Sequence, residues 1–372
     1  MPPGAQPPPI RVLVVGPRGR GGVSRLFDVV RAELATRPLG DIQLRFVTTR
    51  GDVPGRFGAL TTAPWVFTSA LVQQAVLTVT RRVDVVHINL SSYGSTYRKL
   101  VFATCAAMFR VPYVIHLHGG NFRAFWFSCG PLLARRIDRM LESAARIVVL
   151  GPSGRDLVTE RLPACAPAIT VLPNAAPAGQ PQRSDQNHFV RILFLGKLGP
   201  MKGVGELVEA LGLLGFEPTW TATIAGDGAV AETRSMVDRL GLSARISVPG
   251  WLGEADVTRA LEDADILVLP SHVESSPMAV IEAFAHALAV VTTPVGAIPY
   301  LVKDGRTGLL VPAGNAAGLA DALRKLIADP ALRRRLGTNA RAFHAQHLEV
   351  GAYVRRLADV WRAAASQVER CR

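Results

Sequence analysis

Residues 265–288, DILVLPSHVESSPMAVIEAFAHAL, join an apolar strand-like run to a loop and a helix-like run. The run Asp265–Leu269 predicts a buried strand, and the run from Met278 to Leu288 predicts a helix. Glu274 falls in the loop at the carboxyl end of the strand, and Glu282 lies about two helical turns further on. Ligands of open α/β sheets bind outside the carboxyl ends of the strands, so both carboxylates are candidates for contact with one ligand. The alternatives are that Glu274 favours the helix N-terminus through the helix dipole and that Glu282 is a solvated helix residue.

Strand-like and helix-like runs alternate in the same way along most of the chain. The strand-like runs are short and often apolar throughout, as expected of parallel strands that are covered on both faces. This alternation predicts doubly wound parallel sheets. Residues 175–188, rich in Ala, Pro, Gln and Ser, interrupt the pattern and predict a linker. We therefore expect a flexible N-terminus over residues 1–9, a first domain over 10–178 and a second domain over 179–345.

Composition and charge limit the class of protein. A chain of 372 residues is too long for one ordinary core, and 49% hydrophobic with 19% charged residues is typical of a globular protein. Residues 1–178 hold 21 Lys and Arg against 9 Asp and Glu, whereas residues 179–372 hold 21 against 20. A basic first half favours an anionic partner such as a phosphorylated substrate or an anionic membrane. Nucleic acid is disfavoured because the basic residues are scattered and no recognised binding module is present.

Cysteine spacing and hydropathy indicate the compartment. The four cysteines are far apart and form no C-x-x-C pair, so a reducing compartment fits better than a disulfide framework or a zinc site. Residues 1–9 lack an apolar signal core, so no export is implied. Residues 57–80 carry no charge, but Pro64 and several polar residues dilute the segment. Its apolar residues recur at helical spacing, which favours a buried or partner-facing helix over a membrane span and leaves a helix on the membrane surface as the alternative.

A glycine-rich turn, GPRGRGGV at residues 16–23, follows the first predicted strand. Backbone N–H groups in such a turn can approach a phosphate at the start of the next helix. The turn is not a P-loop, because no Gly-Lys-Ser/Thr closes it, and it does not fit a dinucleotide fingerprint cleanly. The alternative is a tight turn that needs glycine for its conformation alone.

Two further strand ends carry polar or charged residues. Lys197 and Lys202 flank a Gly/Pro turn directly before a helix, where a diphosphate would meet two cations and a helix N-terminus, although surface lysines are common. His116 and His118 share one face of the strand that they end, which favours a hydrogen-bonding histidine, since no third metal ligand is near. A polar loop facing the same edge holds Asn89, Ser91, Ser92, Tyr93 and Ser95.

Taken in order, these segments resemble the retaining GT-B glycosyltransferases of family 4. The resemblance covers nearly the whole chain and is most specific in the second half, while the segment 87–95 resembles members that build exopolysaccharide, capsule or lipid-linked oligosaccharide. It implies an α/β protein of GT-B fold, in which two Rossmann-like, doubly wound parallel-sheet domains face a cleft and a C-terminal helix, residues 346–372, packs back on the first domain. The matching segments are Gly21-Gly22, His118-Gly119, Pro173-Asn174, Gly196-Lys197, Lys202-Gly203, Gly226-Asp227-Gly228, Glu274 to Glu282, and residues 294–299 and 304–311.

The resemblance also implies a role for each matching residue. Lys197 and Lys202 would hold the donor diphosphate, and Glu282 would accept hydrogen bonds from the ribose hydroxyls. The family usually has Arg at the first of these positions, so Lys197 keeps the charge but loses the bidentate fork. The residues assigned to the reacting centre are His118 and Glu274. The remaining assignments are donor contacts at Gly22, Ser276, Pro277 and Met278, a nucleobase beside Gly250 and Trp251, and an acceptor beside Asn89, Ser92 and Tyr93.

The expected function is retaining transfer of a hexose from a UDP- or GDP-sugar to a lipid-linked saccharide, in the biosynthesis of a cell-surface polysaccharide. Fixed cations and helix N-termini would stabilise the leaving diphosphate, so neither a metal nor another cofactor is expected. Front-face attack is favoured because the first half shows no evident nucleophile carboxylate. The expected location is cytoplasmic and peripheral, with the basic half on the inner face of the plasma membrane. The alternatives are a GT-B enzyme with a sugar-phosphate acceptor, a non-catalytic nucleotide-sugar-binding protein, and an oxidoreductase that uses the glycine-rich turn.

Overall fold

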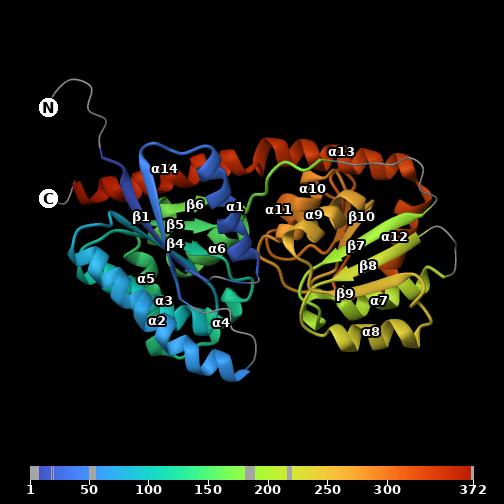
Figure 1. The fold of residues 1–372 in the computed structure, drawn as a ribbon, viewed down its shortest axis with the longest axis horizontal. Helices are drawn as coiled ribbons and strands as arrows, with labels where there is room; N and C mark the ends of the chain where they lie inside the picture. The colour runs from blue at the N-terminus through green and yellow to red at the C-terminus, as the bar shows by residue number, and fades with distance from the viewer. Residues whose placement is uncertain are drawn as a thin grey trace. The chain divides into compact units, whose positions relative to one another are not determined.

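The computed structural model describes residues 8–17, 19, 21–49, 56–180, 189–215 and 220–369. The chain divides into two compact units, which we call the first unit, Met1–Pro173 with Val350–Arg372, and the second unit, Asn174–Glu349. Each unit is a parallel sheet with helices on both faces (Figure 1). Residues 1–7 of the predicted flexible N-terminus and residues 181–188 of the predicted linker lie outside the described residues.

The first unit is built on a six-stranded parallel sheet with the strand order β2-β1-β3-β4-β5-β6. Its inner strands are buried along almost their whole length, which agrees with their apolar sequences. The strands are β1 (Ile10–Gly16), β2 (Ile42–Thr48), β3 (Val85–Leu90), β4 (Tyr113–Leu117), β5 (Arg146–Val149) and β6 (Ile169–Val171). The helices are α1 (Gly22–Thr36), α2 (Arg56–Val79), α3 (Gly94–Met108), α4 (Phe122–Ser128), α5 (Pro131–Glu142), α6 (Pro152–Arg161) and α14 (Val350–Glu369).

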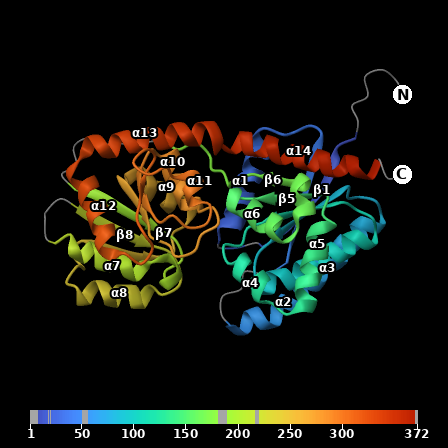
Figure 2. The same ribbon diagram turned by 180° about the vertical axis from the view of Figure 1, so that it is seen from behind.

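The last helix, α14, belongs to the first unit although it follows the whole second unit in sequence. It packs with α1 on one face of the sheet, while α2, α3 and α5 lie on the opposite face (Figure 2). Trp361 of α14 is fully buried and donates its indole N–H to His87 Nδ1 of β3 at 3.1 Å. The guanidinium of Arg362 binds both carboxylate oxygens of Asp41, at 2.7 and 3.0 Å. A buried indole and a bidentate ion pair therefore hold the helix to its sheet.

The second unit repeats the architecture with the strand order β12-β11-β10-β7-β8-β9. The strands are β7 (Val190–Leu195), β8 (Trp220–Ala225), β9 (Ile246–Gly250), β10 (Ile266–Leu269), β11 (Ala289–Thr292) and β12 (Leu309–Leu310). The helices are α7 (Val204–Leu213), α8 (Val230–Arg239), α9 (Glu254–Asp263), α10 (Met278–Ala285), α11 (Ile298–Leu301), α12 (Ala316–Ala328) and α13 (Pro330–His347), and a short 3-10 helix, η2 (Pro200–Lys202), precedes α7.

The predicted limits at residues 178 and 345 differ from the division after Pro173 and after Glu349. The reason lies in a pairing between the two chain segments that connect the units. Ala176 forms a parallel bridge with Glu349, and its N–H donates to the carbonyl of Leu348 at 3.1 Å. The first residues of the linker and the end of α13 are thereby tied to the second unit.

The strand and helix predicted from residues 265–288 form β10 and α10, although α10 ends at Ala285 rather than at Leu288. Ala287 adopts a φ of +58°, which no continuing right-handed helix allows. The uncharged segment 57–80 forms α2, which buries Gln74 and Leu77 but leaves Trp65 79% exposed. Across the described part of the chain, no helix is both long and apolar enough to span a membrane.

Candidate active site

The loop after β10 brings Glu274 into contact with Lys202, which ends η2. The Lys202 ammonium donates to Glu274 Oε1 at 2.5 Å, and the Ser271 hydroxyl donates to the same oxygen at 2.9 Å. Glu274 is only 8% exposed, whereas the Lys202 side chain keeps about a quarter of its surface in solvent. The carboxylate is thus buried and held by one cation and one hydroxyl, at the carboxyl edge of the sheet where α/β folds bind ligands.

Two glycines let other backbone segments approach this loop. Gly203 has a φ of +67°, and a Cβ there would lie 2.1 Å from the carbonyl oxygen of Pro270. Gly296 has a φ of +59°, and a Cβ there would lie 1.9 Å from the carbonyl oxygen of Glu274. Neither position can carry a side chain without displacing the Glu274 loop. The geometry of the Lys202–Glu274 pair therefore depends on glycine at both positions.

The helix that follows carries the other predicted carboxylate. Glu282 of α10 is buried, and Ser276, Pro277 and Met278 are buried at the start of the same helix. The Asn174 side-chain amide donates to the carbonyl of Ser276 at 2.8 Å. Within the described part of the chain, no side chain caps the α10 N-terminus, so its first backbone N–H groups add positive potential at this edge.

The remaining predicted donor contacts lie at neighbouring strand ends. Lys197 is exposed and, among the residues that the structure describes, has no ion-pair or hydrogen-bond partner, so it does not join the Lys202–Glu274 pair. Gly250 ends β9 and accepts a backbone hydrogen bond from Gly226 at 2.8 Å. Trp251 follows it with about half of its surface exposed, so an apolar ring and two glycine turns border this end of the sheet.

In the first unit, His118 and Asn89 lie together at the carboxyl edge of the sheet, where the sequence predicted a group of polar residues. His118 Nε2 lies 2.8 Å from Asn89 Oδ1, and both side chains are buried. Burial lowers the pKa of His118 to about 3. A Cβ at Gly119 would lie 3.0 Å from Ser92 Oγ, so the loops that follow β3 and β4 pack closely together. The structure thus brings His118, Asn89 and Ser92 together.

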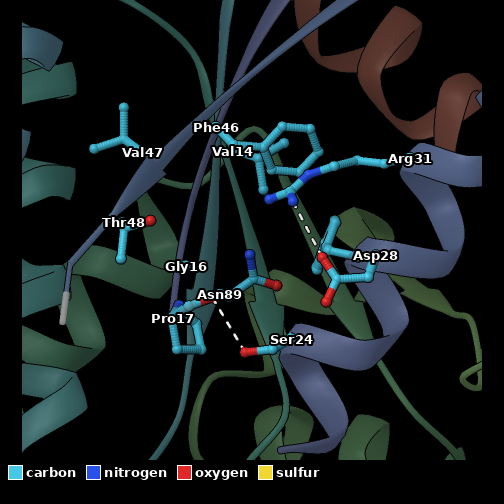
Figure 3. Close-up of a pocket in the computed structure, with 11 residues that line it drawn as sticks. Val14, Gly16, Pro17, Ser24, Asp28, Arg31, Phe46, Val47, Thr48 and Asn89 are labelled. Atoms are coloured by element: carbon cyan, nitrogen blue, oxygen red, sulfur yellow. Dashed lines mark hydrogen bonds and ion pairs between the residues drawn. The ribbon is translucent and has the colours of Figure 1, made fainter. Parts of the chain in front are cut away.

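The turn that follows β1 borders a small pocket beside Asn89 (Figure 3). Its cavity volume is about 20 Å³, which suits one water molecule rather than a sugar. Ser24 of α1 donates to the carbonyl of Pro17 at 3.3 Å across the turn. Gly22 is the first residue of α1, and no side chain among the described residues caps this N-terminus; Arg18 and Arg20 of the same turn lie outside the described residues.

Tyr93, predicted on the acceptor side, adopts an unusual conformation. It precedes α3 with a φ of +56° and a ψ of −129°, a region that side-chain-bearing residues rarely occupy. Tyr93 is 59% exposed, and the centroid of its ring lies 5.0 Å from that of Phe125. Strain of this kind concentrates at binding and catalytic sites, and the sequence pattern alone gave no sign of it.

Sequence reasoning also passed over a buried lysine. Lys99 of α3 donates to Thr49 Oγ1 at 2.6 Å, and burial lowers its pKa to about 7. The backbone N–H of Thr49 donates to the carbonyl of Gly16, the last residue of β1. The signal was present, because Lys99 follows Thr96 and precedes Ala103 and Ala106 at helical spacing on the buried face of α3.

Carboxylates that are close in sequence do not gather into a metal site. Within the described residues, no group of three or more His, Cys, Asp or Glu side chains is arranged to hold a metal ion. Asp263 and Asp265 form an Asp-x-Asp triplet, but both carboxylates bind Arg191, at 3.1 Å to its side chain and 2.8 Å to its backbone N–H. Arg191 therefore binds both carboxylates at the amino end of β10.

The two α/β units, each with polar side chains at the carboxyl edge of a parallel sheet, define a two-domain protein of the GT-B class. Two family profiles match the chain: "Glycosyl transferase 4-like domain" over residues 8–175 and "Glycosyl transferases group 1" over residues 181–343. The chain belongs to the group 1 glycosyltransferases, which confirms the predicted family and fold.

Individual proteins that are similar to this chain are also named as glycosyltransferases. The chain is 29% identical over 175 residues to an alpha-D-kanosaminyltransferase of Streptomyces kanamyceticus, covering 46% of this chain and 45% of that protein. It is 33% identical over 191 residues to a D-inositol 3-phosphate glycosyltransferase of Streptomyces bingchenggensis, covering 48% and 42%. The matched part thus spans less than half the length of these two curated relatives.

Solved structures share the fold at low sequence identity. The crystal structure of Anabaena HepE in complex with UDP and glucose superposes with a TM-score of 0.72 at 18% identity, covering 95% of this chain and all of that one. A sucrose-phosphate synthase of Thermosynechococcus elongatus gives a TM-score of 0.74 at 18% identity, covering 95% and 98%. These similarities support the fold of the chain.

Proposed function

We propose that the protein is a retaining glycosyltransferase that moves a hexose from a nucleotide sugar to a lipid-linked saccharide in cell-surface polysaccharide biosynthesis. The observation that carries the donor assignment is the buried Glu274 carboxylate, held by Lys202 and Ser271 at the carboxyl edge of the second sheet. Glu282 and the uncapped start of α10 lie one loop further on. HepE, which shares the fold, was solved with UDP-glucose and with UDP and glucose, which favours a uridine nucleotide here.

In the proposed reaction, an acceptor hydroxyl oxygen bonds to the anomeric carbon as the bond from that carbon to the diphosphate oxygen breaks. The electron pair leaves with the diphosphate, and the acceptor proton passes to a diphosphate oxygen on the same face of the sugar. Lys202, Lys197 and the α10 N-terminus stabilise the charge that develops on the diphosphate, so we propose that no metal or other cofactor is required. Activity should accordingly survive treatment with EDTA.

The two carboxylates position the donor. Glu274 Oε1 already accepts two hydrogen bonds, which orients the carboxylate and leaves Oε2 for a sugar hydroxyl. Glu282 accepts from the ribose hydroxyls. When the donor binds, the Lys202 ammonium is shared between Glu274 and a phosphate oxygen, and its three N–H groups suffice for both.

The test begins with a thermal-shift panel of UDP, GDP, ADP, UDP-glucose and NAD on the full chain. Stabilisation by UDP or GDP and not by NAD supports the transferase, whereas stabilisation by NAD alone favours the oxidoreductase. Glu282→Gln should raise the KM for the nucleotide sugar, and Glu274→Gln should lower kcat. Glu209→Gln, on an exposed position of α7, is the matched control. Binding of nucleotide with neither hydrolysis nor transfer across a panel of acceptors would identify a binding protein instead.

We further propose that the first unit docks on an anionic membrane surface to reach a lipid-linked acceptor. The neighbouring helices α2 and α3 expose apolar side chains that no other described part of the chain covers. Basic residues follow both helices directly, at Arg81, Arg82 and Arg110, so the exposed apolar side chains adjoin positive charge. Apolar side chains beside arginines suit a surface of anionic lipid. The exposed apolar residues are Trp65, Val72, Val76 and Val79 from α2, and Val101, Met108 and Phe109 from α3 and its end.

Flotation with vesicles tests this docking surface. The full chain should float with phosphatidylglycerol vesicles at low salt, and less with the same vesicles at high salt or with phosphatidylcholine vesicles. The variant Trp65→Ser with Val72→Ser should lose flotation, while Phe189→Ser, at an exposed apolar residue of the second unit, should keep it. Flotation that changes neither with the salt concentration nor with the two α2 substitutions would refute the proposal.

A phosphorylated soluble acceptor is the second candidate. Its support is the 33% identity to a D-inositol 3-phosphate glycosyltransferase together with the basic first half of the chain. Transfer to inositol phosphate or to a sugar phosphate, with no transfer to a polyprenyl-diphosphate-linked sugar, would select this alternative.

A further inference from the structure

An aromatic cluster that the proposed reaction does not use follows the carboxyl end of β4 in the first unit. The short helix α4 has the sequence FRAFWFS, in which four of the seven residues are aromatic. Phe122, Phe125 and Trp126 are buried, and the Trp126 indole N–H donates to Asp138 Oδ1 at 2.9 Å. Arg161 binds both oxygens of the same carboxylate, at 2.8 and 3.1 Å. Packing and an ion pair therefore fix the cluster within the first unit.

Tyr93 packs its ring on this cluster in a strained backbone conformation. Its φ of +56° and ψ of −129° lie in a region that residues with a side chain rarely occupy. Thr96 holds the conformation, because its N–H donates to Tyr93 O and its hydroxyl donates to Ser91 O, both at 2.8 Å. The Tyr93 ring contacts Phe125, with 5.0 Å between the ring centroids. Since Tyr93 stays 59% exposed, burial of its ring does not explain why the strain is kept.

The exposed side of α3 changes in character along the helix. This helix begins beside the carboxyl end of β3 and ends before the amino end of β4, so it runs from one edge of the sheet to the other. Tyr97, in the second turn, is 56% exposed, much like Tyr93 at the start. Val101 and Met108 continue the same side at helical spacing and belong to the proposed docking surface. Phenol rings at the carboxyl edge thus give way to aliphatic and thioether side chains further along α3.

We infer that Tyr93 and Tyr97 form a subsite for the saccharide of the acceptor, in which a sugar ring stacks its C–H face on the phenol rings. The inference rests on the proposed function and uses residues of the first unit alone. A sugar has an apolar face of C–H groups and an edge of hydroxyls, and an exposed tyrosine offers an apolar face and a hydroxyl to match them. The lipid of the same acceptor then extends toward Val101 and Met108. A lipid chain on the two tyrosines is the competing occupant.

NMR of the full chain with ring-labelled tyrosine tests the subsite and needs no activity. The chain has five tyrosines, so Tyr93→Phe and Tyr97→Phe suffice to assign the two signals. The probes are octyl β-D-glucoside, octyl β-D-galactoside and octanol, which share one alkyl chain and are used below the concentrations at which they aggregate. We expect both signals to shift saturably with at least one glycoside and not with octanol. Equal shifts with octanol would assign the rings to lipid, and no shift with either glycoside would also overturn the inference.

Transfer kinetics with UDP-glucose and the octyl glycosides add a second readout. Tyr93→Ala and Tyr97→Ala should each raise the acceptor KM about 2- to 10-fold and leave the KM for UDP-glucose unchanged. Tyr93→Phe keeps the ring and should keep the acceptor KM close to the wild-type value. Phe189→Ala, at an exposed ring of the second unit, is the matched control. An acceptor KM that neither alanine variant changes would refute the subsite. Absence of any transfer, with the tyrosine signals shifting as expected, would instead count against the proposed function.

Discussion

Removal of the Lys202 ammonium should expose the cost of burying Glu274. In Lys202→Met the carboxylate, only 7% of whose side chain is exposed, keeps the Ser271 hydroxyl but loses its cation at 2.5 Å. Breaking a fully buried ion pair costs about 3–5 kcal/mol, and an exposed pair contributes less than about 1 kcal/mol. Because the Lys202 side chain keeps 27% of its surface, we expect a loss of about 2–3 kcal/mol in the free energy of unfolding.

Removal of the Glu274 charge should lower the free energy of unfolding less than removal of the Lys202 charge. This difference between the two variants is the sharper test. Glu274→Gln leaves Lys202, which can turn its ammonium to water, so the expected loss is about 1 kcal/mol. The double variant loses both charges and should resemble Glu274→Gln alone, which gives a coupling energy of about 2–3 kcal/mol.

Scanning calorimetry measures these differences. For a unit of this size, 1 kcal/mol shifts the Tm by about 2–4 °C, so Lys202→Met should lower the Tm of the second unit by about 4–12 °C. Lys197→Met is the matched control on the same turn, because Lys197 is exposed and without an ion pair among the described residues, and its expected shift is below about 1 °C. Additive single-variant effects, or equal shifts for the two lysine variants, would refute the reasoning.

Three further predictions concern single residues. Gly203→Ala should lower the free energy of unfolding by more than about 3 kcal/mol in urea titrations, because its Cβ would lie 2.1 Å from Pro270 O; a loss below about 1 kcal/mol would contradict the geometry. Burial lowers the pKa of Lys99 from 10.5 to about 7, so the folded state binds fewer protons and stability should rise between pH 7 and 10.5 by up to about 1.4 kcal/mol per unit. Lys99→Met should flatten that rise, and an unchanged slope would show that Lys99 stays charged. Tyr93→Gly should be about 1–2 kcal/mol more stable than Tyr93→Ala, since both lose the Phe125 contact but only glycine relieves the φ of +56°; equal melting temperatures would argue against strain.

The fold was predictable from sequence because its signals are local. The strand β10, its loop and α10 occupy consecutive residues, so an apolar run followed by helical spacing was enough to identify them. Parallel strands covered on both faces have the uniformly apolar sequences that were recognised in both halves. The end of α10 was missed, since the positive φ of Ala287 depends on packing rather than on residue type.

The pairing of side chains was not predictable, because it joins residues that are far apart in the chain. Lys202 and Glu274 are separated by 72 residues, and sequence reasoning assigned them to different groups of one ligand without seeing that they would contact each other. Trp361 and His87 are separated by 274 residues. In sequence, His87 is one of two polar residues in an otherwise apolar strand, and only the packing of α14 on β3 reveals its partner Trp361.

The two units differ in the charge state of their polar residues, and the proposed chemistry gives a reason. Lys202 and Glu274 of the second unit form an ion pair, and the proposed donor would bring its diphosphate to this pair. The histidines of the first unit are buried, and burial lowers the pKa of each, so they remain neutral. Glycosyl transfer passes through a transition state with positive charge on the sugar ring. The proposed function assigns His118 to the reacting centre, where a protonated imidazole would repel the developing charge and the neutral, buried imidazole does not.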